Sequence, residues 1–162
     1  MNRSVLNKSF ISVALLVAAG YASHAFAHTA AGMLDPNGNN PNATDVAQVI
    51  CYDDGDGPTD HLYVQIQDNS SPVPGLFVSA QVLKDNQNGS QMANTTDTSP
   101  GDNSASNPIA VGSGDGLYWL SVSKTNVAGP RQFTVTYHCQ TIDDVHTGTC
   151  GPSDGCGILQ IQ

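Results

Sequence analysis

The stretch Arg131-Gln-Phe-Thr-Val-Thr-Tyr-His-Cys139 decides the fold class, because apolar and polar side chains alternate along it. A period of two residues is typical of a β-strand with one buried face. The stretches 61–67 and 76–83 alternate in the same way. One face of the first stretch would hold its apolar side chains, Phe133, Val135, Tyr137 and Cys139.

The composition favours strands and turns over helices. The chain contains fourteen Asp and no Glu, and Lys is scarce. Asp, Asn, Gly, Ser and Thr are abundant, and these residues favour turns and caps because their side chains compete for nearby backbone groups. Further short strand signals occur at 46–52, 108–111 and 117–123, with turn residues between them. We therefore expect an all-β domain of seven or eight short antiparallel strands with long polar loops.

The later strands show a family resemblance. The segment Asp115-Gly-Leu-Tyr-Trp-Leu-Ser-Val122, a Gly-Pro turn and the stretch 131–139 together resemble the late strands of bacterial immunoglobulin-like domains. Tyr137 lies two residues before Cys139, which is the spacing of a tyrosine corner. Trp119 departs from the pattern, because it falls on a late strand. The resemblance implies an immunoglobulin-like β-sandwich and carries no function.

The N-terminal region indicates export. A charged segment at 3–8, an apolar stretch at 10–20 and the small-residue site Ala25-Phe26-Ala27 together predict a signal peptide over residues 1–27. Residues 28–45 would then form an extended N-terminal segment, and 46–162 the β-sandwich domain. The protein is expected to be secreted or periplasmic. No later apolar run is long enough to predict a membrane span.

Four cysteines follow the predicted signal peptide, and an even number in an exported chain indicates disulfides. The short loop Cys150-Gly-Pro-Ser-Asp-Gly-Cys156 favours one local bridge, which leaves Cys51 to pair with Cys139. A metal site made from all four thiolates is the alternative. The chain lacks the paired C-x-x-C spacing that such a site usually has.

The charge of the processed chain is strongly negative. After Ala27 the cations are Lys84, Lys124 and Arg131, against fourteen aspartates, so the formal net charge is −11. Such a surface repels phosphate backbones, and we expect no nucleic-acid partner. It would attract cations or basic proteins, although solubility alone also explains it.

Cleavage after Ala27 would leave His28 as the first residue, with a free amine and an imidazole on one residue. In this respect His28 resembles the first half of the histidine brace of exported copper proteins, in which a second imidazole completes a nitrogen-rich Cu(II) site. The alternation of the strands places His138 and His61 on outward faces, so we expect His138, or else His61, to complete the site. An ordinary exposed polar role is the alternative for each histidine, including His146 in a predicted loop.

Two other kinds of site have weaker support. Four acids crowd one turn and could form a cation loop, with calcium as the less favoured ligand: Asp53, Asp54, Asp56 and Asp60. Their spacing departs from the EF-hand, and a plain hairpin turn explains them equally well. The sequence around Ser113 fails the Gly-x-Ser-x-Gly pattern of a nucleophile elbow, so no catalytic residue is assigned.

The sequence thus favours a secreted or periplasmic binding protein that holds copper through its mature N-terminal histidine. The alternative is a cell-surface or extracellular structural or interaction module with no metal chemistry. The ligand would accordingly be a metal ion or a protein partner. An enzyme, in the form of a copper oxygenase, ranks third.

Processing gives the first testable prediction. Export should remove residues 1–27, and the intact mass of the exported chain should match a protein that starts at His28. A mature chain that starts at Phe26, or after Thr29, would contradict this expectation and remove the chelating amine.

Overall fold

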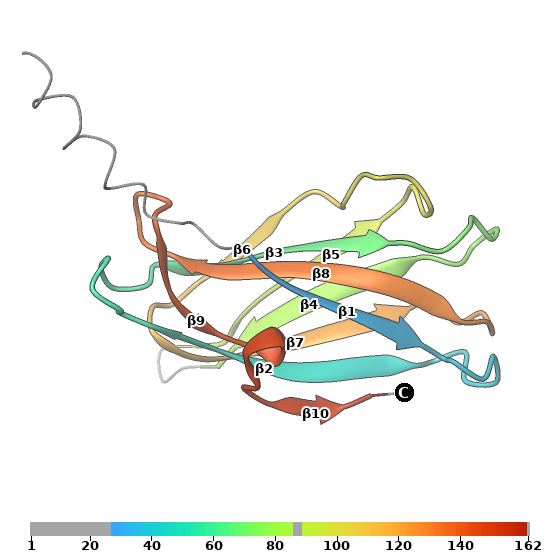
Figure 1. Cartoon of the computed structure of the whole chain (residues 1–162), viewed down its shortest axis with the longest axis horizontal. Helices are drawn as coiled ribbons and strands as arrows, with labels where there is room; N and C mark the ends of the chain where they lie inside the picture. Colours follow the sequence, from blue (N-terminus) through green and yellow to red (C-terminus); the bar gives the residue numbers. More distant parts are fainter. Residues whose placement is uncertain (1–26, 86–88, 162) are drawn as a thin grey trace, which may run out of the picture.

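The computed structural model describes residues 27–85 and 89–161, so the predicted signal peptide lies almost entirely outside the described residues. The described residues form ten strands and a short 3₁₀-helix (Figure 1). In chain order these are β1 (His28–Leu34), β2 (Thr44–Tyr52), β3 (His61–Asp68), β4 (Val78–Lys84), β5 (Gln91–Asp97), β6 (Ile109–Gly112), β7 (Gly116–Lys124), β8 (Arg131–Gln140), β9 (His146–Cys150), η1 (Pro152–Asp154) and β10 (Ile158–Gln160). None of the described helical structure has the length and apolarity that a membrane crossing requires.

The expected immunoglobulin-like sandwich is wrong, although the all-β class is correct. Eight strands form one nearly closed, barrel-like antiparallel sheet in the order β5-β4-β7-β2-β9-β8-β3-β6 (Figure 1). Strand β9 makes the difference, because it pairs with Ile50–Tyr52 of β2 on one side and with Cys139 and Gln140 of β8 on the other. It thereby joins strands that a sandwich would place in separate sheets.

Tyr137 does not form the tyrosine corner that the resemblance implied. The Tyr137 hydroxyl lies 2.6 Å from Ser153 Oγ and accepts the Ser153 N–H at 3.0 Å. In a tyrosine corner the hydroxyl bonds to backbone a few residues upstream. Here it holds η1, which follows Tyr137 in the chain, against the end of the sheet.

Strand β1 lies within the segment 28–45, where no apolar periodicity predicts a strand. All seven of its residues pair with β8, from His28 opposite Tyr137 to Leu34 opposite Arg131. Gly32 explains part of the weak signal, because a Cβ at this position would lie 2.5 Å from the Phe133 ring. The pairing of β1 with β8 therefore requires a glycine at position 32. The same pairing places His28 at one end of the sheet.

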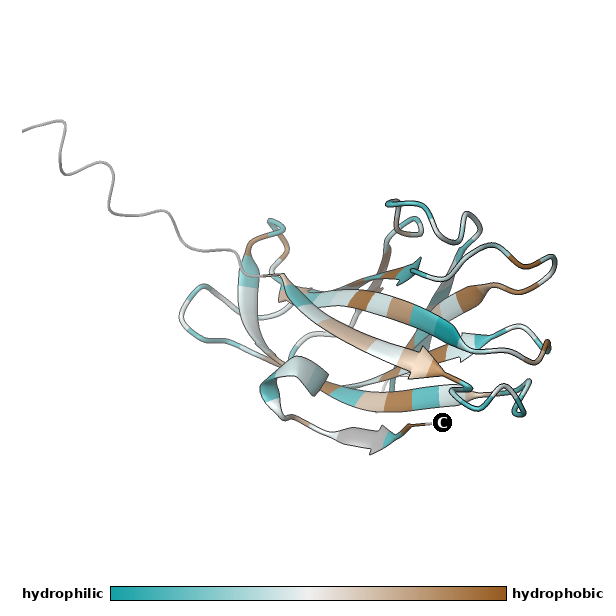
Figure 2. Cartoon of the chain, turned by 45° about the vertical axis from the view of Figure 1, so that its right-hand side comes forward, coloured by the Kyte–Doolittle hydropathy of each residue, from teal (hydrophilic) through white to brown (hydrophobic). Residues whose placement is uncertain are grey.

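The core follows the alternation that the sequence predicted. Leu62, Val64 and Ile66 of β3 are fully buried, and the residues between them are partly exposed. Figure 2 shows the same alternation as bands of apolar and polar colour along the strands. The interior of the sheet is therefore a packed apolar core.

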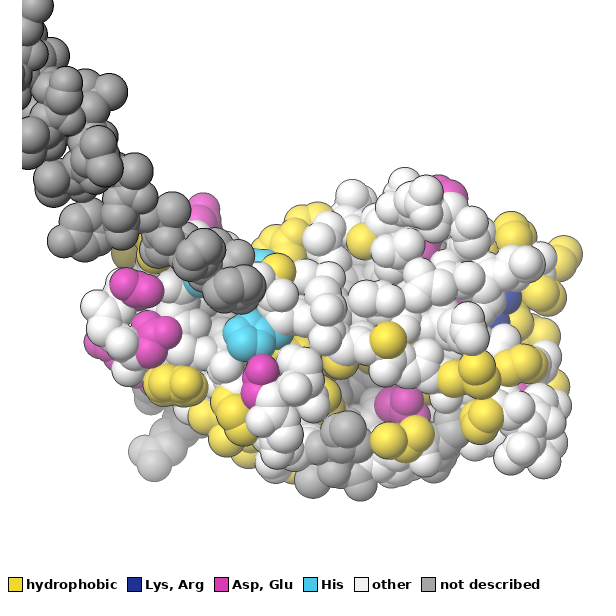
Figure 3. All heavy atoms as spheres, in the orientation of Figure 1, with side chains coloured by type: hydrophobic (Ala, Val, Ile, Leu, Met, Phe, Trp, Pro, Cys, Tyr) yellow, Lys and Arg dark blue, Asp and Glu magenta, His cyan; other side chains and the backbone are white. Residues whose placement is uncertain are grey.

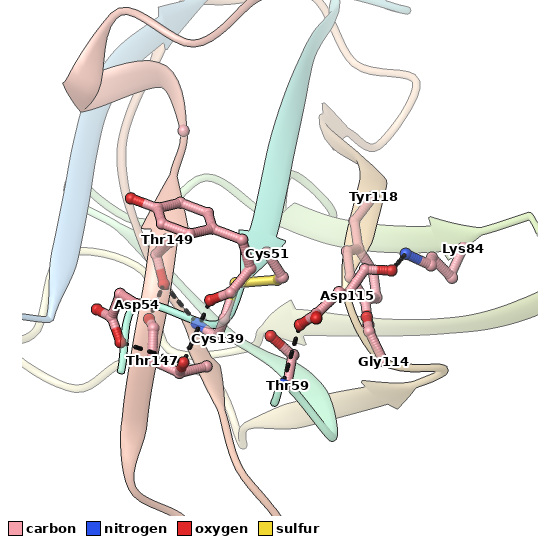
Figure 4. The surroundings of a disulfide bond; sticks show 12 residues. Cys51, Asp54, Thr59, Lys84, Gly114, Asp115, Tyr118, Cys139, Thr147 and Thr149 are labelled. Atoms are coloured by element: carbon pink, nitrogen blue, oxygen red, sulfur yellow. Dashed lines mark hydrogen bonds between the residues drawn. A yellow bond between two sulfur atoms is a disulfide. The ribbon is translucent and has the colours of Figure 1, made fainter. Parts of the chain in front are cut away.

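Both expected disulfides are present. Cys51 of β2 and Cys139 of β8 are bonded with their Cα atoms 5.7 Å apart, and Cys150 and Cys156 with theirs 5.6 Å apart. Figure 4 shows the first bridge beside Thr149, whose hydroxyl accepts the Cys139 N–H at 2.8 Å. Two disulfides are consistent with an oxidising location.

All three cations that follow residue 27 are buried. Lys124 donates to Asp35 at 2.6 Å, and Arg131 donates to Asp68 at 2.9 Å through Nε. The Lys84 ammonium donates to the Asp115 carbonyl and lies 4.1 Å from the centre of the Tyr118 ring (Figure 4). Each basic side chain thus fastens a loop or strand from inside the molecule.

The end strands β5 and β6 approach each other without forming a ladder. The Thr95 hydroxyl of β5 donates to the Asn107 carbonyl just before β6, at 2.6 Å. The buried Asp97 carboxylate accepts the Asp68 N–H of β3 at 2.7 Å. Side-chain hydrogen bonds therefore hold this junction of the barrel-like sheet.

The two disulfides should differ in their contribution to stability. Cys51 and Cys139 are 88 residues apart and Cys150 and Cys156 are 6 apart, so chain entropy predicts losses of about 4–5 and about 2 kcal/mol on removal. Urea unfolding of Cys51→Ser and Cys150→Ser should show this order. A Cys150→Ser variant that is the less stable of the two would contradict it.

The Lys124–Asp35 pair predicts a pH dependence. Burial acts to raise the pKa of the Asp35 carboxyl, but Lys124 and the N–H groups of Gly129, Asn40 and Asn39 outweigh it and hold this pKa well below its usual range. A lowered pKa stabilises the fold above the ordinary value of about 4, and this stabilisation is lost as the pH falls below it. Asp35→Asn should therefore be less stable at neutral pH and lose less stability on acidification than the wild type.

The control for this experiment is Asp143→Asn, since Asp143 is exposed. Its free energy of unfolding, measured with urea at a series of pH values, should follow that of the wild type. Parallel curves for Asp35→Asn and the wild type would show that Asp35 contributes nothing to acid sensitivity.

Candidate functional site

The candidate site lies where the ends of β3, β8 and β9 meet. The register places His61 opposite Gln140, Tyr63 opposite His138, and Gln140 opposite His146. Residues opposite one another share a face of the sheet, so the three histidines gather on one outer surface. Figure 3 shows histidine side chains grouped at this end of the molecule, beside several carboxylates.

His138 forms the middle of an aromatic stack. Its ring centre lies 4.5 Å from that of Tyr63 and 4.1 Å from that of His146, with angles of 16° and 24° between the planes. Only 7 % of His138 is exposed, and its buried Nδ1 has no hydrogen-bond partner in the structure. Burial, followed by the nearby His146, His28 and His61, lowers the pKa of His138 to about 4. The ring is therefore neutral at physiological pH.

His28 reaches the same end of the molecule from β1. Its ring stacks on Tyr137 at 5.8 Å, and its Nδ1 lies 3.0 Å from Asp154 Oδ2 of η1. Tyr137 and His138 point to opposite faces of β8 because they are adjacent in the strand. His28 thus lies close to the stack without being part of it.

His28 and His146 line one pocket. Its volume is about 300 Å³, and the other lining residues are Tyr52, Asp54, Asp56, Thr147, Gly148 and Thr149. The pocket therefore combines two imidazoles with two exposed carboxylates. This juxtaposition brings together β1, β9 and the turn that follows β2.

His61, the second residue expected to complete a brace, has both ring nitrogens engaged. Nδ1 lies 3.0 Å from Asp60 Oδ2 and Nε2 lies 2.9 Å from Gln140 Oε1. Asp144 Oδ1 lies a further 3.8 Å from Nε2. These contacts engage both ring nitrogens and hold the ring in place.

The predicted cation loop uses its carboxylates to shape the turn. Asp53 Oδ1 accepts the N–H groups of Gly55 and Gly57, at 2.8 and 3.2 Å. Asp54 Oδ1 accepts the Asp56 N–H at 3.4 Å, while Asp60 contacts His61. In the part of the chain that the structure describes, no three His, Cys, Asp or Glu side chains are placed to hold one metal ion.

The sequence placed His146 in a loop and gave it no part in the site. The structure places it at the start of β9, where it stacks on His138 and shares the pocket with His28. The short stretch His146-Thr-Gly-Thr-Cys150 contains one apolar residue, so its alternation was invisible as a hydrophobic pattern. The two threonines alternating with His, Gly and Cys were the available signal.

The carboxylates of the site give it a negative charge that suits a cation. The side chains, however, do not point at one common position, as the ligands of a bound metal ion do. An imidazole binds a metal through a lone pair in the plane of the ring, and the planes of His138 and His146 are nearly parallel. The two rings therefore do not converge on one ion as they stand. A brace avoids this requirement, because its third ligand is a main-chain amine and it needs only two side chains.

Comparisons with known proteins add no family. No family model, curated protein or solved structure gives a significant match to the chain.

Proposed function

We propose that this chain is a secreted or periplasmic protein that binds one Cu(II) ion at its processed N-terminus. The amine and imidazole of His28 would supply two nitrogen ligands, and the imidazole of His146 the third. Nitrogen-rich sites of this kind suit Cu(II). The observation that carries the proposal is the pocket that His28 and His146 line together.

The electrostatics of the pocket support a cation. Asp54 and Asp56 line it, and Asp154 lies beside His28 Nδ1. The basic side chains after residue 27 are buried elsewhere in the fold, so none of them competes for these carboxylates. A divalent ion would therefore enter a region of negative potential.

The stack supports His146 as a ligand in a second way. Outer contacts that fix the orientation of a metal-binding imidazole commonly raise its affinity. His146 packs against the ring of His138, which in turn packs on Tyr63. His138 thereby serves the site as a positioning residue, and its unpartnered Nδ1 lies within the same cluster.

Copper titration of four matched proteins tests the proposal. Protein that starts at His28 should bind one Cu(II) at least about tenfold more tightly than the same protein with its terminal amine acetylated, a loss of about 1.4 kcal/mol or more. The reason is that acetylation converts the His28 amine into an amide and leaves no other amine beside it to anchor the metal. His146→Ala should weaken binding by a similar factor, and His61→Ala should not, because its ring is already engaged.

Isothermal titration gives the affinities, and electron paramagnetic resonance reports the number of nitrogen ligands on Cu(II). The spectrum of the His28-starting protein should lose nitrogen couplings when its terminal amine is acetylated. Equal affinities and identical spectra for these two proteins would rule out the N-terminal site.

A further inference from the structure

The barrel-like sheet has an opening between β1 and β10. Strand β9 joins β2 to β8 at the histidine end of the sheet. Farther along, β1 lies on the same edge of β8 as β9 does, and β10 lies on the same edge of β2. Within the described residues, β1 pairs only with β8 and β10 only with β2. We call this opening the β1–β10 seam, lined chiefly by Ala30, Gly32, Ala47, Leu120, Phe133 and Gln160.

The strand directions show what would close the seam. The pairs β1–β8, β8–β9, β9–β2 and β2–β10 are all antiparallel. Strands β1 and β10 therefore run in the same direction, so a single strand between them would be antiparallel to both. The addition of an extended segment to unpaired strand edges is an established mode of peptide recognition. An antiparallel sheet of this order thus lacks one strand at the seam.

The seam leads to the core. It forms an apolar hollow of about 320 Å³, because the inward positions of β1 and β2 carry the small residues Ala30 and Ala47. Phe133 and Val122 at the seam are 5 % and 4 % exposed, whereas Val64 and Tyr118 elsewhere in the core are fully buried. An added strand could therefore place alternate apolar side chains into the hollow.

The charge of the molecule indicates which kind of peptide segment would bind at the seam. Lys84, Lys124 and Arg131 are buried, and so are Asp35, Asp68 and Asp97. The other eleven aspartates are partly or fully exposed, so the charged side chains on the outer surface, histidines apart, are carboxylates. A second copy of the chain would meet repulsion, while a basic segment would be attracted.

From these observations we propose that the seam binds an extended segment of a protein partner, in which apolar residues that enter the hollow alternate with Lys or Arg that face the solvent. This interaction surface is distinct from the copper site, since no residue that lines the hollow also lines the histidine pocket.

The test uses metal-free protein that starts at His28, in the presence of a chelator, and synthetic peptides of seven residues, the length of β1. One peptide alternates Lys and Val, a second replaces each Lys with Glu, and a third contains the Lys and Val of the first in non-alternating order. The alternating basic peptide should bind at least about tenfold more tightly than the other two. Hydrogen exchange should show new protection of the backbone amides of β1 and β10.

Two variants test the location. Ala47→Phe and Ala30→Leu fill the hollow from opposite sides and should each abolish protection by the peptide. Ala110→Phe adds the same bulk as Ala47→Phe on exposed β6 and should leave binding unchanged. Circular dichroism and thermal unfolding show which variants are folded. If a variant fails to fold, the hydrogen-exchange protection of β1 and β10 in the wild type still locates the peptide.

Several results would overturn the proposal. Equal binding of the alternating and non-alternating basic peptides would mean general attraction to an acidic surface. Protection that is absent from β1 and β10, or that persists in folded Ala47→Phe, would place the peptide elsewhere. Concentration-dependent dimerisation by sedimentation, with protection of the same two strands, would make a second copy the occupant.

Discussion

The Cys51–Cys139 disulfide is the constraint on which the closure of the sheet depends. It joins β2 to β8, and these are the two strands that β9 pairs with on its opposite sides. β9 has five residues and few apolar side chains, so burial alone gives it little stability. By fixing the two strands that flank it, the bridge makes the short ladder of β9 sufficient to close this part of the sheet.

The same constraint organises the histidine cluster. Cys139 lies between His138 and Gln140 in β8, and its partner in β9 is Thr147, the neighbour of His146. A displacement of β9 along β8 by one residue would turn His146 to the other face and separate it from His138. Thr147 helps to prevent such a displacement, because its hydroxyl donates to the Gly57 carbonyl at 2.7 Å and lies 3.2 Å from the Tyr52 carbonyl. Stability at the core and geometry at the surface therefore depend on one register.

The sequence predicted the individual strands better than their arrangement. Alternation in 61–67 and 131–139 identified β3 and β8 almost to the residue, and the spacing of the cysteines gave the correct pairs. The alternation of one-faced strands is the same in a sandwich and in a barrel, so it could not reveal that β9 joins the sheets. β1 was missed because Ala30 and Gly32 give little apolar signal. The role of His146 was missed because it depends on the pairing of β9 with β8, which the sequence did not predict. That His28 begins the processed chain remains a prediction, based on its position after the small-residue site. Its part in a metal site stays a proposal.

The burial of every Lys and Arg beyond residue 27 has a consequence for the chemistry of the folded protein. The ammonium groups of Lys84 and Lys124 bond to oxygen atoms inside the molecule, so acylating and crosslinking reagents that attack amines would find them shielded. The peptide bonds that trypsin cleaves lie beside the same buried side chains. In a chain that begins at His28, the reactive amine at the surface would be the terminal one. A single label at that amine would then mark the exported protein without altering any residue of its core.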